Sequence, residues 1–382
     1  LAFLPSPVFQ AAQAEADWTL MVYLDADNNL DASSVLNMEQ MVAGMVPTSR
    51  VNVIVLMDRF LLPAYYYQVT SEGYFELASL GEVDMGDPRT MRDFLTYAMR
   101  HFPAEHYFLD IWNHGSGIFG VAYDDSEIDE ETGESSKLMI RELKESIAAA
   151  ESMTRDWIDV VGFDACLMGM TEVGYELKDV ADIVIASELL VPGEGWPYEA
   201  LTEFLSSNPE VDPHSLSERL IEDYLNFIYP KYFVQLAAID LAGLVDTVGK
   251  LDVLVDRMLS SGTDRELIAQ ARGEAYLDGI MGTWGYYFFV DLYKFADLIG
   301  LYSADVEIRT AARNVMDSLE QAIFASGYGG RKSRLETGNC GVSLYFPPND
   351  ENYRSEYVED VPEFTTDTSW VPFLFEFFRA EQ

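Results

Sequence analysis

The chain contains very few cysteines and histidines. Among its 382 residues, only Cys166 and Cys340 carry thiols, and there are four histidines. Two cysteines exclude a disulfide framework, although a single bridge stays open. A structural zinc site is also disfavoured, because such sites usually take four Cys or His ligands.

Basic residues are scarce as well. The chain has 24 Lys and Arg against 65 Asp and Glu, which gives a formal net charge of −41. This charge repels nucleic acid and anionic membrane surfaces, so neither is an expected partner. It favours cationic partners such as basic peptides and metal ions. Many of these carboxylates can also form a solvated surface that keeps the protein in solution.

Long apolar runs are absent. No stretch beyond the N-terminal segment reaches about 18 uninterrupted apolar residues, so no transmembrane helix is expected. Residues 1–16 hold a short apolar stretch that ends in Ala14-Glu15-Ala16. This small-x-small pattern typically precedes a signal-peptidase cut, so we expect the remainder of a secretory signal and a secreted protein. A frayed N-terminus is the alternative.

Short apolar runs recur along the chain and are typical of buried strands in a parallel sheet. Helix-period segments lie between several of them, which predicts a doubly wound α/β core. The expected strands are Thr19–Leu24, Val51–Met57, Tyr107–Trp112, Val160–Phe163, Ile183–Ala186, Val234–Ile239 and Val342–Phe346.

The pattern becomes mainly helical after about residue 240. We therefore divide the chain into a core, 17–240, and a largely helical part, 241–382, that returns a strand (341–346) to the core. The expected helices are Ser33–Val46, Thr90–Arg100, Arg141–Ala150, Pro213–Phe227, Ala242–Leu259, Asp264–Glu274 and Ala304–Ala325.

Two expected strands lead directly to reactive side chains. Tyr107–Trp112 is followed by His114, and Val160–Phe163 is followed by Cys166. Active sites of such sheets lie beyond the carboxyl ends of the strands. A thiol attacks an acyl carbon as thiolate, and an imidazole can deprotonate the thiol and later protonate the leaving amine. We therefore predict that Cys166 is the nucleophile and His114 its base, with the N–H groups of Gly115 and Cys166 forming the oxyanion hole.

Taken singly, Cys166 could be a core thiol and His114 a polar residue at a strand end. Their joint placement favours catalysis. Cys340 has no such partner in the sequence and is predicted to be structural.

Five motifs occur in order along the chain. They are DWTLMVYLDADNNL at 17–30, NHGSG at 113–117, GFDACLM at 162–168, PGEGWPY at 192–198 and GVSLYFP at 341–347. Together they resemble the clostripain family of cysteine peptidases, which are relatives of gingipains, legumain, separase and caspases. The resemblance implies a caspase-like α/β sandwich with a mostly parallel central sheet and a His-Cys dyad.

The resemblance also implies hydrolysis after Arg or Lys. It places Asp164 at the base of the pocket for the basic residue, with Glu194 and Trp196 beside it. A desolvated guanidinium requires a carboxylate, which agrees with this assignment. Relatives often carry Asp where Glu194 stands, so the preference between Arg and Lys stays open. The alternatives are a helix cap for Asp164, a solvated turn for Glu194 and ordinary packing for Trp196.

Residues 124–140 are predicted to form an exposed, mobile activation loop. Clostripain relatives are commonly cut between the His and Cys strands, so we expect self-cleavage after Lys137, with Arg141 or Lys144 as alternatives. The protein would then be a monomer or a self-processed two-chain form. Lys137 could instead only neutralise the acidic loop.

The chemistry requires no cofactor, but the sequence offers candidate calcium ligands. Asp124, Asp125 and Asp129 supply carboxylate oxygens, although their spacing is not that of an EF-hand. A solvated acidic loop is the alternative. A second oxygen-rich cluster, 25–31, could line the cleft or hold a cation, and turn or capping chemistry explains it nearly as well.

The leading hypothesis is a secreted, extracellular cysteine endopeptidase that cleaves protein and peptide substrates after Arg or Lys. The same dyad could serve a transpeptidase or an esterase. A catalytically silent protein that binds basic peptides is the alternative from another functional class.

Overall fold

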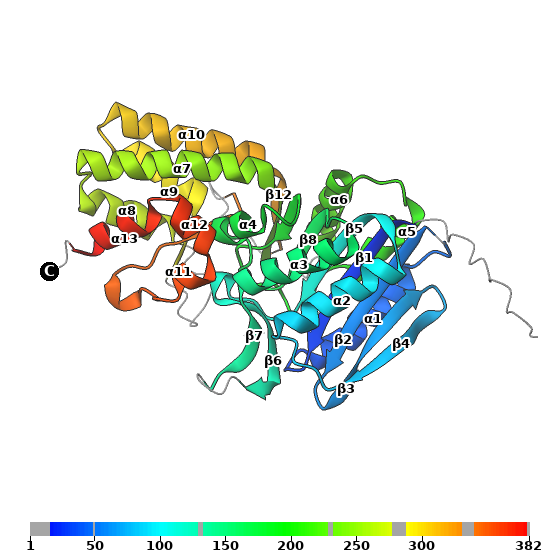
Figure 1. The fold of residues 1–382 in the computed structure, drawn as a ribbon. Coiled ribbons are helices and arrows are strands. Elements are labelled where there is room, and N and C mark those ends of the chain that lie inside the picture. The colour runs from blue at the N-terminus through cyan, green and yellow to red at the C-terminus, as the bar shows by residue number, and fades with distance from the viewer. Residues whose placement is uncertain are drawn as a thin grey trace, which may run out of the picture.

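The computed structural model describes residues 16–48, 50–128, 133–227, 232–276, 288–330 and 340–379. Within these ranges the main sheet has nine strands, in the order β12-β10-β9-β8-β5-β1-β2-β3-β4 (Figure 1). The strands from β9 to β2 in this order run parallel, and both edges are antiparallel. The strands are β1 (Ala16–Ala26), β2 (Val51–Arg59), β3 (Leu62–Thr70), β4 (Gly73–Gly81), β5 (Ala104–Trp112), β8 (Val160–Asp164), β9 (Ile183–Ala186), β10 (Phe233–Asp240) and β12 (Ile323–Gly330).

Helices cover both faces of the sheet, because its central strands bury both of their faces. Along β1, Trp18, Leu20 and Val22 pack into one core, whereas Met21 and Tyr23 pack into the other. The expected α/β sandwich is therefore confirmed. One face carries α1 (Asp31–Gly44), α5 (Tyr198–Ser207) and α6 (Pro213–Phe227), and the other carries α2 (Pro88–His101), α3 (Ile140–Thr154) and α4 (Thr171–Leu177).

The C-terminal part is largely helical, as expected. Figure 1 shows its long helices stacked beside the sheet, with α10 packed on α7 and α9. Within the described residues, no helix is both long enough and apolar enough to cross a membrane. The helices are α7 (Leu241–Ser261), α8 (Arg265–Ala275), α9 (Leu292–Tyr302), α10 (Val306–Ala322), α11 (Tyr357–Asp360), α12 (Pro362–Asp367) and α13 (Trp370–Arg379).

The strand that returns to the main sheet is not the one that the sequence predicts. Residues 341–346 do form a strand, β13 (Ser343–Tyr345), but it pairs with β11 (Phe289–Asp291) in a separate two-stranded sheet. Instead β12 joins the main sheet beside β10, where we expected the end of a helix. Glycine allows α6 to pack closely on this edge strand, because a Cβ at Gly327 would lie 2.5 Å from a side-chain carbon of Leu225.

The predicted activation loop is more ordered than expected in its described part. It forms a hairpin of β6 (Val121–Ile128) and β7 (Ser135–Leu138). Asp124 is fully buried, and its carboxylate accepts hydrogen bonds from the N–H groups of Met85, Ser126 and Glu127. The exposure predicted for this residue is therefore wrong.

Candidate active site

The structure brings His114 and Cys166 to adjacent positions at one edge of the sheet. Strands β5 and β8 are parallel neighbours, and Trp112 pairs with Asp164. His114 and Cys166 each lie two residues after this pair, so they follow neighbouring strands at the same level of the sheet. The backbones stay in contact there, because a Cβ at Gly115 would lie only 2.5 Å from the Cys166 carbonyl oxygen. Both side chains are half-buried, whereas their immediate neighbours are buried.

Asn29 holds the imidazole of His114. Its Oδ1 lies 2.6 Å from His114 Nε2. With Oδ1 accepting from Nε2–H, the neutral ring carries its lone pair on Nδ1. The sequence does not identify this partner, because Asn29 is one of several polar residues after the first strand. Its neighbour Asn28 fixes the segment by donating to the Tyr123 carbonyl at 3.0 Å.

The resting thiol and imidazole are both neutral near pH 7. Burial raises the pKa of Cys166 to about 11, although the Val191 N–H, 3.2 Å from Sγ, opposes the shift. Burial lowers the pKa of His114, and Asp125 opposes that shift. A thiolate must therefore form during attack or after a rearrangement of the site.

The turn that follows the strand β8 exposes a donor beside the sulfur. Leu167 has φ 68°, in the left-handed region that Leu rarely adopts, and its N–H bonds to the Leu189 carbonyl at 2.9 Å. In the described part of the chain, the Cys166 N–H has no acceptor. It is available for a developing oxyanion.

Asp164 belongs to a buried group that the sequence only partly indicates. Its Oδ2 accepts from the Trp196 N–H at 2.8 Å and lies 3.0 Å from the Tyr198 hydroxyl. The same hydroxyl lies 2.6 Å from Oδ2 of Asp110, which is also fully buried. The Tyr198 hydroxyl can donate its single proton to only one of the two carboxylates. At neutral pH, Asp164 and Asp110 therefore share one further proton. Burial accordingly raises the pKa of Asp164 to about 7 and that of Asp110 well above its ordinary value.

The segment around Trp196 closes over Asp164. Gly195 has φ 73°, and a Cβ there would lie 2.6 Å from Asp164 Oδ2. Trp196 is fully buried and packs on Phe108 with ring centroids 6.3 Å apart. In this conformation Trp196 is a core residue, so its predicted place beside the pocket for the basic residue requires the segment to move.

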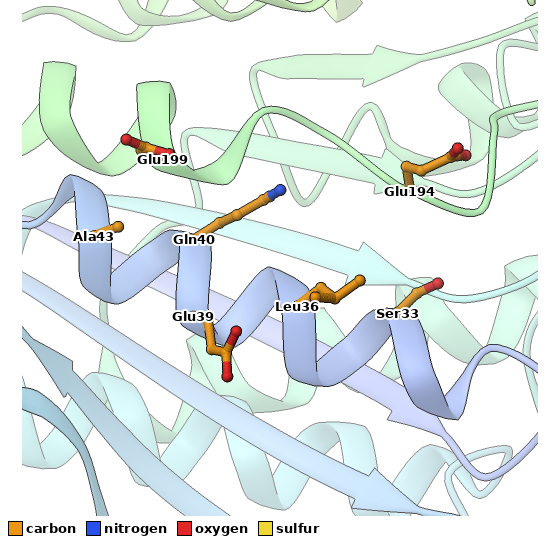
Figure 2. Close-up of a pocket in the computed structure, with 7 residues that line it drawn as sticks. All are labelled: Ser33, Leu36, Glu39, Gln40, Ala43, Glu194 and Glu199. Carbon is orange, nitrogen blue, oxygen red and sulfur yellow. The ribbon is translucent and has the colours of Figure 1, made fainter. Parts of the chain in front are cut away.

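Glu194 lies elsewhere, on an open acidic groove of about 360 Å³ between α1 and α5. Figure 2 shows Gln40 extending from α1 into the space between α1 and the segment that carries Glu194 and Glu199. The Glu194 carbonyl accepts from Asn37 Nδ2 at 3.0 Å, which ties this loop to α1. Glu194 thus lines this groove, whereas Asp164 is buried against the adjacent Gly195. The groove is lined by Ser33, Leu36, Glu39, Gln40, Ala43, Glu194 and Glu199.

The three candidate cleavage residues differ in their local structure. Lys137 lies in β7, where its Nζ bonds to Glu134 at 3.0 Å. Arg141 and Lys144 lie on the helix α3. Among the three, only Lys137 is in an extended segment, the conformation that peptidase clefts generally bind.

The candidate calcium ligands are not gathered into a site in the part of the hairpin that the structure describes. Asp124 is buried and engaged by backbone N–H groups, and Asp125 Oδ1 accepts from the Ser135 hydroxyl at 2.7 Å. Asp129 lies outside the described residues. Cys166 and Cys340 are both free thiols, so the single bridge that the sequence left open does not form.

The fold and the paired strand ends define a caspase-like α/β peptidase architecture. The sequence profile of the clostripain family matches residues 22–376, so the chain belongs to that family of cysteine peptidases. It is 24% identical over 421 residues to clostripain from Hathewaya histolytica, with 92% of this chain and 78% of that protein covered.

Two solved structures share the fold over nearly the whole chain. One is a secreted C11 cysteine protease from Bacteroides thetaiotaomicron in complex with an irreversible peptide inhibitor, with 21% identity, a TM-score of 0.69 and coverage of 93% of this chain and 99% of that one. The other is an inactive zymogen C11 protease from Parabacteroides distasonis, with 16% identity, a TM-score of 0.68 and coverage of 94% and 98%.

Proposed function

We propose that this clostripain-family cysteine peptidase is an endopeptidase that cleaves after Arg or Lys, with Cys166 as nucleophile and His114 as base. The adjacency of the two residues at the ends of β5 and β8 carries the proposal. The chemistry itself needs no cofactor.

Nδ1 of His114 takes the thiol proton as Sγ attacks the scissile carbonyl carbon. The N–H groups of Cys166 and Gly115 stabilise the oxyanion. Asn29 accepts from the resulting imidazolium, which then protonates the leaving amine. Water hydrolyses the thioester with the same imidazole as base and restores the thiol.

Asp164 supports the preference for a basic residue. In the resting state a shared proton compensates the buried charges of Asp164 and Asp110. A substrate guanidinium or ammonium would pair with the Asp164 carboxylate, while Asp110 keeps the proton, once the segment around Gly195 moves away from Asp164. Such a buried cation needs a charged partner, and the Asp164 carboxylate supplies it. Glu194 and the acidic groove beside it favour the approach of cationic chains.

The intact chain is proposed to be a latent form that processes itself after Lys137. Two features support latency. The Cys166 thiol is neutral at rest, and the segment around Gly195 covers Asp164. Leu138, which follows the scissile bond, is fully buried, so β7 must detach before cleavage. The signal-like N-terminal residues and the net charge of −41 are consistent with a secreted two-chain enzyme that avoids membranes and nucleic acid.

A panel of short peptides with Arg, Lys, Asp or Asn before a reporter amide tests the proposal. We expect turnover of the Arg and Lys peptides, loss of turnover in Cys166→Ala and His114→Ala, and retained turnover in Cys340→Ala. Asp or Asn preference would contradict the specificity. Binding of basic peptides without turnover would indicate a silent binding protein, and efficient transfer to added amines would indicate a transpeptidase.

A further inference from the structure

A short turn, residues 192–195, covers the carboxylate of Asp164. The turn is closed by its own hydrogen bond, from the Gly195 N–H to the Pro192 carbonyl at 2.9 Å. Gly195 has φ 73° and lies against Asp164, because a Cβ there would lie 2.6 Å from Oδ2. Asp164 is only 4% exposed. Residues 192–195 are called the cover turn below, since they lie between solvent and this carboxylate.

A buried asparagine on α1 holds the cover turn. Asn37 is 1% exposed, and its Nδ2 donates to the Glu194 carbonyl oxygen at 3.0 Å. The same nitrogen donates to Oε1 of Gln40 at 3.2 Å, and Gln40 extends into the groove between α1 and the segment that carries Glu194 (Figure 2). Both amide hydrogens of Asn37 therefore have an acceptor.

The indole of Trp112 fixes the orientation of the Asn37 amide. Trp112 Nε1 can only donate, and it lies 2.9 Å from Asn37 Oδ1. A flip of the amide would place two donors against each other and remove the donor from the Glu194 carbonyl. Trp112 is the last residue of β5, so Asn37 ties the cover turn to the strand that leads to His114.

The inner and outer sides of the cover turn differ in their packing. The inner side contacts Asp164 and Asn37. On the outer side Gly193 is exposed, and the nearest atom to a Cβ there, in Leu30, lies 3.5 Å away. The residue that follows the turn, Trp196, is fully buried and anchors it on the core. The turn can therefore swing outward while Trp196 stays in place.

We infer that Asn37 is the positioning residue that keeps the cover turn closed, and that release of its bond to the Glu194 carbonyl opens Asp164 to the basic side chain of a substrate. The inference rests on the proposed function, because it takes Asp164 as the partner of that side chain.

The size of the effect follows from a two-state turn. The closed state is the one in the structure, so the apparent affinity for an Arg peptide is the intrinsic affinity multiplied by a small open fraction. The loss of one hydrogen bond should raise this fraction by about two- to tenfold. KM for the Arg peptide should fall by the same factor in Asn37→Ala, and kcat should stay unchanged.

Amide hydrogen exchange of residues 192–198, read by mass spectrometry, tests the inference together with peptide kinetics of the full-length protein. In Asn37→Ala we expect faster exchange of this segment and the lower KM for the Arg peptide. KM for a peptide with a neutral residue in place of Arg should not change, and exchange in α2, on the opposite face of the sheet, should not change either. Asn37→Leu fills the buried space without a donor and should behave in the same way, so the test does not depend on the folding of Asn37→Ala.

Ser206→Ala is the matched control. The Ser206 hydroxyl is buried in α5 and accepts from the Val46 N–H, just beyond α1, at 3.0 Å. Its loss weakens the contact between the same two helices without touching the cover turn, so exchange of residues 192–198 and KM should match those of the unmodified protein.

Unchanged exchange of residues 192–198 in the Asn37 variants would overturn the inference. Faster exchange with an unchanged or higher KM for the Arg peptide would overturn it as well, and so would an equal rise of exchange in α2, which indicates general loosening. If the unmodified protein cleaves none of the peptides, the proposed function fails, and the exchange measurement still decides whether Asn37 holds the turn.

Discussion

The Asp164→Asn substitution removes one buried negative charge and changes the size of the side chain very little. If Asp164 binds the basic residue of the substrate, the variant leaves a guanidinium desolvated without its partner. Breaking a buried ion pair in this way costs about 3–5 kcal/mol, which corresponds to a loss of about 10²- to 10⁴-fold in kcat/KM. The loss should affect Arg and Lys peptides and spare a peptide with a neutral residue at that position.

The buried Asp164 carboxylate also predicts that the preference for a basic residue depends on pH. Burial raises the pKa of Asp164 to about 7, so the carboxylate is charged above that pH and becomes neutral as the pH falls through it. The ratio of kcat/KM for an Arg peptide to that for a neutral peptide should therefore fall below about pH 7. Taking the ratio at each pH cancels the titration of the thiol and the imidazole, which both substrates share.

The assay measures kcat and KM for both peptides between pH 5 and pH 9 in the unmodified protein, Asp164→Asn and Asp110→Asn. Burial and the neighbouring Asp164 raise the pKa of Asp110 well above its ordinary value, and Asn resembles its neutral form. Asp110→Asn is therefore the matched control and should largely keep the preference for Arg. Equal losses on the Arg and neutral peptides in Asp164→Asn, or an unchanged ratio across this pH range, would refute the reasoning.

Three further substitutions test the neighbouring parts of the site. Asn29→Ala should lower kcat by about tenfold to a hundredfold with little change in KM, because a hydrogen bond to the charged imidazolium contributes about 1.5–3 kcal/mol; an unchanged kcat would rule out this positioning role. Gly115→Ala should abolish turnover, because its Cβ would lie 2.5 Å from a backbone oxygen, whereas Gly273→Ala, with no atom within 4 Å of the new Cβ, should be active. Lys137→Gln should keep the chain intact on a denaturing gel, and continued cleavage at residue 137 would contradict the proposed processing site.

The fully buried strands of the sheet could be predicted from sequence, and its exposed edges could not. The strands β1, β5 and β8 are buried on both faces and therefore stand out as apolar runs. The edge strand β4 is largely exposed and β3 is only partly buried, so neither stands out as an apolar run. These edge strands form because a neighbouring strand offers backbone hydrogen-bond partners. The local sequence pattern does not show which strand will be the neighbour.

Only part of the site could be predicted from the sequence as well. His114 and Cys166 could be predicted because each directly follows a recognisable strand. The contact between Asn29 and His114 joins residues 85 positions apart, and the contact between Tyr198 and Asp110 joins residues 88 apart. Such contacts depend on the order of strands in the sheet. The packing of Trp196 could not be predicted for a related reason, since its sequence neighbours do not reveal that the residue packs on Phe108.

Covalent capture of the nucleophile tests the central claim most directly. The purified protein is treated with a peptide that carries Arg and a thiol-reactive electrophile in place of the scissile bond, and the modified residue is mapped by mass spectrometry. The proposed dyad predicts one label on Cys166, a slower reaction in His114→Ala and no label on Cys340. A label on Cys340 alone, or equal labelling rates with and without the imidazole, would contradict the proposed dyad.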